Sequence, residues 1–127
     1  MKTSYVVGLS MLAGAALGTT AIQALHAQAK PPAIVVVDIS DITDPEGFKV
    51  VTQRPTATTV TVREGGRYIA RTNKITAIDG AAPKQFVVIA FDSAEKAQAW
   101  YNTPDQDKIN DIRKKTTKSR VFMVEGM

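Results

Sequence analysis

Two short apolar runs constrain the fold of this chain more than any other feature. Ala33–Ser40 reads AIVVVDIS, and Gln85–Phe91 reads QFVVIAF. Both have the length of a strand and present apolar side chains on both faces, which is typical of strands in the middle of a covered sheet. We therefore expect the two runs to form central strands of one sheet.

The segment between the runs begins as a helix and then becomes ambiguous. Asp44-Pro45-Glu46 has the residues preferred at the N-cap, the first helical position and the acidic first turn. The β-branched Thr58–Val62 favours a hairpin with Arg67–Arg71, but the Gly65-Gly66 pair is equally suited to end a long helix. Local sequence leaves both interpretations open.

Two further helix starts follow the second run. Asp92 and Glu95 form a variant capping box before a helix that ends near Trp100-Tyr101. Thr103-Pro104 and Gln106 form a second box, with threonine as the N-cap and proline at the first helical position. The sequence therefore predicts two consecutive helices here.

The last helix has an apolar side and charges that follow its dipole. Ile109 and Ile112 mark the side that we expect to be buried. Lys114 and Lys115 lie in the last turn, where the negative end of the helix dipole favours cations, and Lys118 follows. We interpret this basic end as solvated rather than as a phosphate-binding patch.

Arg67–Ile78 and Arg120–Glu125 are the remaining expected strands, the first with a bulge or turn near Thr72-Asn73. The order strand, helix, strand, strand, helix, strand is the split βαβ arrangement of the ferredoxin-like fold, an α+β class with an antiparallel four-stranded sheet. Helices cover one face of such a sheet, and here the other face is apolar. Because an exposed apolar face is a liability, we expect a homodimer.

Residues 1–29 have the pattern of a secretory signal peptide. Lys2 precedes the apolar Tyr5–Leu17, and Ala27-Gln28-Ala29 has the small residues of a cleavage site. We expect export to the periplasm or the medium, a single domain over residues 30–127, and no stable membrane association after cleavage. The alternative is an N-terminal membrane anchor, although polar residues interrupt Tyr5–Leu25.

The composition limits the kinds of catalytic, metal and nucleic-acid-binding site that the chain can form. The single histidine, His26, lies in the expected leader, and the chain has no cysteine. The mature protein then lacks imidazole and thiol, so we expect no metal site, no haem ligation by histidine and no cofactor. After the loss of Lys2, fifteen Lys and Arg oppose twelve Asp and Glu, which is too mild a charge for a nucleic-acid-binding protein.

An ordered set of short motifs resembles the bacterial domain-of-unknown-function family thirteen-thirty, one of the dimeric α/β-barrel groups. The resemblance covers Ile34–Gly126 and rests on Asp44-Pro45-Glu46 with Phe48, Gly65-Gly66-Arg67-Tyr68 with Ala70-Arg71, Ala99-Trp100-Tyr101-Asn102 with Pro104, and Val124-Glu125-Gly126. It implies that Pro45–Glu64 is one helix. The chain departs from the family pattern in the threonine-rich tail of that helix and in Thr72-Asn73, where glycine commonly follows the arginine. The family has no established activity, so no catalytic residue is implied.

Arg67 and Arg71 are candidate anion ligands directly after the glycine turn. We expect them to share one face of a strand, with Tyr68 on the other. Their guanidinium groups would clamp a carboxylate or phosphate, and Arg71 is the stronger candidate. The alternative, which we favour, is salt bridging to Asp or Glu on neighbouring strands, with Glu125 as a natural candidate.

Trp100, Tyr101 and Asp38 are the other candidate site residues. The two aromatic residues combine apolar rings with polar tips, as ligand pockets do, although core packing is their commoner role. Asp38 interrupts a strand of Ile and Val and would serve as a general base if it were buried without a partner. It would equally pair with an arginine or lie in water near the strand end. Asp38, Arg71 and Tyr101 are therefore weak catalytic candidates.

Three functions remain open. The first is a homodimeric small-molecule-binding module with Arg71, Trp100, Tyr101 and Arg67 as ligand contacts. The second is a cofactor-independent enzyme, similar to monooxygenases or isomerases, that acts on a small anionic or aromatic metabolite. The third is a purely structural dimerisation module. RNA binding is disfavoured because the central strands lack paired aromatic residues for stacking on bases.

Overall fold

The computed structural model describes residues 30–126 except residue 54, so the expected signal peptide, with His26, lies outside the described residues. Within the described part, no helix is long and apolar enough to cross a bilayer. In chain order the elements are β1 (Ala33–Ile42), α2 (Pro45–Thr52), α3 (Thr56–Arg63), β2 (Arg67–Thr72), β3 (Gln85–Phe91), α4 (Ala94–Tyr101), α5 (Pro104–Thr116) and β4 (Thr117–Glu125).

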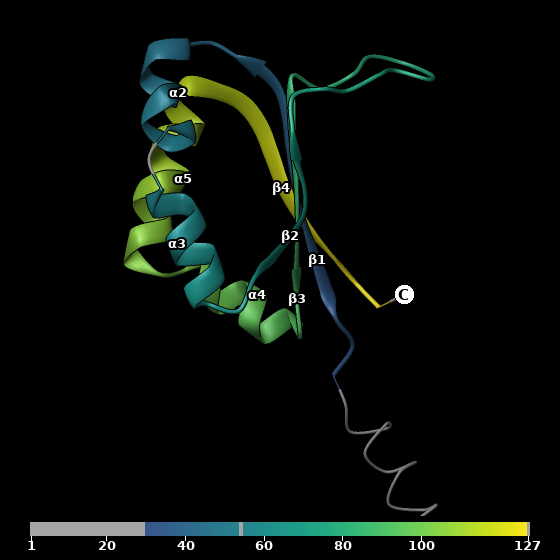
Figure 1. The fold of residues 1–127 in the computed structure, drawn as a ribbon, viewed down its shortest axis with the longest axis vertical. Coiled ribbons are helices and arrows are strands. Elements are labelled where there is room, and N and C mark those ends of the chain that lie inside the picture. Colours follow the sequence, from purple (N-terminus) through teal and green to yellow (C-terminus); the bar gives the residue numbers. More distant parts are fainter. Residues whose placement is uncertain (1–29, 54, 127) are drawn as a thin grey trace, which may run out of the picture. The chain divides into compact units, whose positions relative to one another are not determined.

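The four strands form one antiparallel sheet in the order β2-β3-β1-β4. Figure 1 shows the helices on one side of this sheet and none on the other. The two apolar runs are the central strands, as predicted, and the ferredoxin-like α+β fold is confirmed. The helix-covered face of the sheet forms one side of the hydrophobic core.

The core lies between the helices and the central strands. Val35 of β1 pairs with Ile89 of β3 and with Met123 of β4, and this row of side chains faces the helices. The buried cluster consists of Ala33, Val35, Val60, Ile89, Phe91, Ala97 and Trp100. It therefore joins both central strands to α3 and α4, and burial of its apolar surface drives the association of the two layers.

The threonine-rich segment Thr56–Arg63 is a helix, so the predicted hairpin is wrong. The single helix over Pro45–Glu64 is also wrong, because α2 ends at Thr52 and α3 begins after Pro55. Proline has no N–H to donate, and its ring clashes with a preceding helical turn, so it separates the two helices. Within α3, the Thr59 hydroxyl donates to the Pro55 carbonyl at 2.9 Å. The threonine hydroxyl is therefore hydrogen-bonded while the backbone remains helical.

A glycine pair ends α3, as the helical interpretation of the sequence required. Gly66 N–H donates to the Thr61 carbonyl at 2.8 Å, and Gly65 N–H donates to the Val62 carbonyl at 3.0 Å. These two bonds are the Schellman motif, and Gly65 has the positive φ of 89° that the motif demands. Strand β2 begins directly after this turn, at Arg67.

Strand β2 is shorter than predicted and has its bulge elsewhere. It ends at Thr72 instead of Ile78. The chain turns at Thr72-Asn73, one of the two predicted alternatives, and Lys74 N–H donates to Thr72 Oγ1 there at 2.9 Å. The register shift of the bulge lies earlier, between Tyr68 and Ala70. Beyond the shift, Arg71 pairs with Val87 of β3, a residue of the helix-covered face. The extra residue of the bulge reverses the alternation. Arg71 therefore shares a face with Tyr68, and the prediction that it shares one with Arg67 is wrong.

The two helices after β3 begin where the sequence predicts, but some of their capping residues differ from the prediction. Ser93 is the N-cap of α4 instead of Asp92, and its Oγ accepts from Lys96 N–H at 3.3 Å. Thr103 caps α5 as predicted, accepting from Gln106 N–H at 3.2 Å. The Gln106 side chain does not close the box, because its amide donates to Asn110 Oδ1 instead. It points into the protein.

Candidate functional site

A small cavity of about 70 Å³ lies between the helices and the covered face of the sheet. All four strands and all four described helices contribute to its wall. The apolar part of the wall includes Val37, Ile39, Phe48, Val87, Ile89 and Val121, and the polar part includes Thr61, Tyr68, Arg71, Gln85, Tyr101, Gln106, Asn110 and Arg113. The cavity is therefore an apolar chamber with polar groups at defined places, as ligand sites are.

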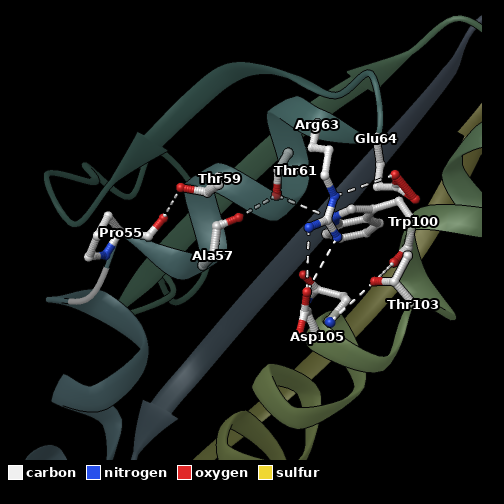
Figure 2. A network of polar contacts seen from close by, with 10 residues as sticks. Pro55, Ala57, Thr59, Thr61, Arg63, Glu64, Trp100, Thr103 and Asp105 are labelled. Atoms are coloured by element: carbon white, nitrogen blue, oxygen red, sulfur yellow. Dashed lines mark hydrogen bonds and ion pairs between the residues drawn. The ribbon is translucent and has the colours of Figure 1, made fainter.

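Thr61 connects the wall of the cavity to the core. Its hydroxyl donates to the Ala57 carbonyl at 2.8 Å and accepts from the Trp100 indole N–H at 3.2 Å and from the Tyr68 hydroxyl at 3.1 Å. Figure 2 shows Thr61 between Ala57 and Trp100. Thr61 is 1% exposed, so these bonds are shielded from water. The Thr61 hydroxyl is thus the hydrogen-bond partner of both the Trp100 indole N–H and the Tyr68 hydroxyl.

Helix α5 turns a polar stripe toward the cavity. Gln106, Asn110 and Arg113 are spaced by four and three residues, which places them on one helical face. All three are buried and line the cavity. The two residues predicted as the buried side, Ile109 and Ile112, are only partly buried. The innermost face of α5 is therefore polar.

Arg113 is a buried cation with neutral partners. Its Nη1 donates to Ser119 Oγ at 3.0 Å, and its Nη2 donates to the Tyr101 hydroxyl at 3.2 Å and to Asn110 Oδ1 at 3.5 Å. Arg113 is 6% exposed. Within residues 30–126, leaving aside residue 54, no carboxylate forms an ion pair with it. Buried arginines in proteins are normally paired with an anion.

Arg71 lies at the mouth of the same cavity. Its Nη1 donates to Thr58 Oγ1 at 2.6 Å, and its guanidinium stacks over the Tyr68 ring at 5.3 Å from the ring centre. An outer depression of about 380 Å³ shares Thr52, Arg71 and Gln85 with the cavity wall. Arg71 is therefore placed where a ligand would pass from solvent to the interior. The described lining of the cavity contains these two arginines and no acidic residue.

The structure brings together only some of the residues proposed from sequence. Arg71, Trp100 and Tyr101 line the cavity. Trp100 is also a core residue, since it is 3% exposed and its N–H is used by Thr61. Arg67 and Asp38 lie outside the cavity.

Asp38 lies on the open face of the sheet. It accepts from Arg120 Nε at 2.9 Å, and Arg120 is its register partner on β4. The neighbouring Val37 and Ile39 point to the other face and line the cavity. Asp38 thus pairs with an arginine, one of the alternatives that the sequence left open, and it does not face the cavity.

Arg67 pairs with a carboxylate at the end of β3. Its Nη1 lies 3.1 Å from Asp92 Oδ1, and Lys96 Nζ lies 3.4 Å from the other oxygen of that carboxylate. The salt bridging expected for Arg67 is present, but Glu125 as its partner is wrong. The strands β2 and β4 occupy opposite edges of the sheet, with β3 and β1 between them.

The ion cluster around Asp92 predicts a small dependence of stability on pH. Hydrogen bonds from Arg67 and then Lys96 lower the pKa of Asp92. A carboxylate whose pKa falls on folding stabilises the protein above its unfolded pKa of about 4, and this contribution disappears as the pH falls through the lower folded value. We expect Asp92→Asn to make the acid side of the stability profile shallower below about pH 4, as measured by urea unfolding between pH 7 and pH 2. Parallel profiles for the variant and the wild type would show that the cluster is energetically silent.

The sequence reasoning missed Gln106, Asn110 and Arg113. Gln106 also fits a capping box, and the lysines that follow Arg113 indicate a solvated helix end. The signal that would have identified the three is their spacing, since polar residues at i, i+4 and i+7 share one face of a helix. A polar stripe on the inner face of a helix indicates a buried network rather than a packed core.

The fold and the cavity together define a ferredoxin-like α+β protein with its candidate site between the layers. More particularly, the chain belongs to the family described as a domain of unknown function (DUF1330), whose model matches residues 32–127. The resemblance noted in the sequence is therefore confirmed. A comparison with curated proteins gives no significant match.

Several solved structures share the fold at low sequence identity. The RPA0582 protein of unknown function from Rhodopseudomonas palustris is 11% identical, with a TM-score of 0.60 over 85% of this chain and 92% of that chain. SnoaB from Streptomyces nogalater, a cofactor-independent oxygenase, is 13% identical, with a TM-score of 0.55 over 76% and 94%. A dimeric ferredoxin-like protein of unknown function from Thermobifida fusca is 12% identical, with a TM-score of 0.59 over 76% and 92%. At these identities the likeness establishes the fold alone.

Proposed function

We propose that this domain is a homodimeric protein that binds a small organic anion in the cavity between its helices and its sheet. The observation that carries the proposal is Arg113, a 6%-exposed guanidinium with only neutral partners in the described part of the chain. Burying a cation without a counter-charge costs several kcal/mol. An anionic ligand would supply the missing counter-charge. Part of its binding free energy would come from removing the cost of the unpaired, buried Arg113.

The cavity accounts for Arg71 and Arg113 better than the neighbouring groove does. An apolar groove of about 230 Å³ beside β4 shares Trp100 and Tyr101 with the cavity, but its described lining has no charged residue. The chamber at Arg113 holds only a few non-hydrogen atoms, and much of its wall is apolar. These properties favour a short carboxylate with a small apolar body over a phosphate ester or a large metabolite.

Binding is favoured over catalysis by what faces the ligand. The described cavity wall offers Tyr101 as a proton donor, but it contains no carboxylate to act as a base. Asp38, a weak candidate for a base from the sequence, is on the opposite face of the sheet and pairs with Arg120. The likeness to SnoaB concerns the fold only, so it does not favour an oxygenase.

The homodimer is supported by the open face of the sheet. That face carries Ile34, Val36, Phe86, Val88, Ala90, Phe122 and Val124, which alternate along the strands with the residues facing the helices. Phe122 is 42% exposed and Val124 is 51% exposed. A second copy would cover this apolar surface. The fold neighbour from Thermobifida fusca is described as dimeric.

We also propose that the domain is exported. The proposal rests on the n-region, the apolar run and the Ala27-Gln28-Ala29 site of the leader. Mass spectrometry of the protein from a cell-envelope fraction should give a mature N-terminus at Lys30. An intact Met1 terminus in a membrane fraction would favour the anchor instead.

Thermal unfolding with small carboxylates tests the binding proposal. We expect acetate, propionate or butyrate to stabilise the wild type saturably, by about 2.7 kcal/mol at one hundred times Kd, which is a rise in Tm of roughly 13 °C. Arg113→Met keeps the volume of the side chain and removes its charge, so it should abolish this stabilisation. Sodium chloride at equal ionic strength separates binding from screening.

The control variant is Arg63→Met. Arg63 is half-exposed, pairs with Asp105 at 3.4 Å and does not line the cavity (Figure 2). It should retain the full response to carboxylates. If the wild type shows no saturable response to any of the three acids, or if both arginine variants respond alike, then the cavity is not an anion site.

A further inference from the structure

The hydrogen-bonding groups in the cavity wall include an unpaired acceptor besides the cationic donor Arg113. Gln106 is 5% exposed, and its Oε1 is buried without a hydrogen-bond partner among the described residues. Buried amide oxygens are almost always paired, because leaving one unpaired costs free energy. Oε1 thus requires a donor that the surrounding residues do not supply.

The orientation of the Gln106 amide is fixed by its neighbours. Asn110 Oδ1 accepts from Arg113 Nη2 at 3.5 Å, while Asn110 Nδ2 donates to the Tyr101 carbonyl at 3.4 Å. The oxygen of Asn110 therefore faces donors, and the group 3.0 Å from it must be the NH₂ of Gln106. Exchanging O and N of Gln106 would set two acceptors against each other. Oε1 is consequently the free acceptor.

The side chain that carries the free acceptor lies beside Arg113. Gln106 Nε2 and Arg113 Nη2 contact the same oxygen of Asn110, so the two side chains are neighbours. The Tyr101 hydroxyl accepts from Arg113 and keeps its own proton to donate. All four residues line the cavity. A small molecule bound against these residues would meet a cation, a hydroxyl donor and an amide acceptor.

We infer that the ligand is a short hydroxycarboxylate, an inference that rests on the anion-binding function proposed above. Its carboxylate would accept from Arg113 and Tyr101, and its hydroxyl would donate to Gln106 Oε1. An amino acid is disfavoured, because its ammonium group would enter a chamber that contains two arginines and no described acid. The apolar wall suits a small hydrocarbon body.

Matched acids that differ only by the hydroxyl test this inference. Isothermal titration of the wild type should give lactate or 3-hydroxypropionate a Kd at least tenfold lower than that of propionate, because propionate leaves Oε1 unpaired. In Gln106→Leu the acceptor is absent, and the Kd values of all three acids should agree within about threefold. Asn110 keeps Arg113 as a donor in this variant, and Gln106→Met is a second variant with a flexible side chain.

Each outcome has a definite meaning. If propionate binds within tenfold of both hydroxy acids in the wild type, a water molecule satisfies Gln106 and the hydroxycarboxylate is refuted, while anion binding stands. If discrimination persists in both Gln106 variants, the inferred contact is refuted as well. If none of the acids binds the wild type, the proposed anion-binding function itself fails, and the inference fails with it.

Discussion

Replacing Thr61 with valine is expected to lower the free energy of unfolding by about 2–4 kcal/mol, a large effect for a change that keeps the size of the side chain. The hydroxyl of Thr61 is the common partner of the Trp100 indole N–H and the Tyr68 hydroxyl. Valine offers neither ring an acceptor, so two polar groups lose their partner in or beside the core. The cost of leaving a buried donor unpaired is about 1–3 kcal/mol each.

Thr59 provides a control in the same helix. Its hydroxyl also donates to the carbonyl four residues earlier, at 2.9 Å, but Thr59 is exposed and no ring depends on it (Figure 2). Thr59→Val should therefore change the stability by no more than about 0.5 kcal/mol. Urea unfolding followed by Trp100 fluorescence measures both variants. Equal losses for the two would mean that helix propensity, and not the shared hydroxyl, sets the stability here.

The sheet was predictable because its sequence signal is local. Strands β1 and β3 are apolar on both faces, which is typical of strands at the centre of a sheet. Helix α3 was not predictable in the same way, because Thr and Val at successive positions favour strands in isolation. In the protein, the helix is stabilised by contacts distant in sequence, since Val60 and Thr61 are buried against β1, β3 and Trp100. Tertiary packing overrides propensity here.

The candidate site was only half visible in the sequence for a geometrical reason. A bulge of one residue in β2 turns Arg71 toward the helices, and no local pattern predicted its position. Likewise, the inward direction of Gln106 and Arg113 depends on how α5 packs on the sheet. Trp100 and Tyr101 were predictable because an aromatic pair on the inward side of a helix indicates a core or a pocket, whereas an arginine on a lysine-rich helix indicates a solvated face.

The second large effect concerns the open face of the sheet. In the proposed homodimer, Phe122 and Val124 of β4 are covered by the partner, so Phe122→Lys or Val124→Lys would bury an unpaired charge. Such a charge costs about 2–5 kcal/mol, which raises the dimer Kd at least about thirtyfold. Light scattering with size-exclusion chromatography should show a wild-type dimer at micromolar concentration and variants shifted toward the monomer. Val62→Lys is the matched control, because Val62 is 59% exposed on α3, away from that face, and its variant should remain dimeric.

The same variants separate assembly from binding. Residues of β1 alternate between the two surfaces, so Val37 and Ile39 line the cavity while Val36 belongs to the open face. Because the sheet itself lies between the cavity and the interface, a Val124→Lys monomer should bind carboxylates with a Kd within about threefold of the wild-type value. Loss of binding on dissociation would show that the partner completes the site. A wild type that stays monomeric at micromolar concentration would refute the dimer, while the charge argument for Arg113 would stand unchanged, because it depends on burial within one chain.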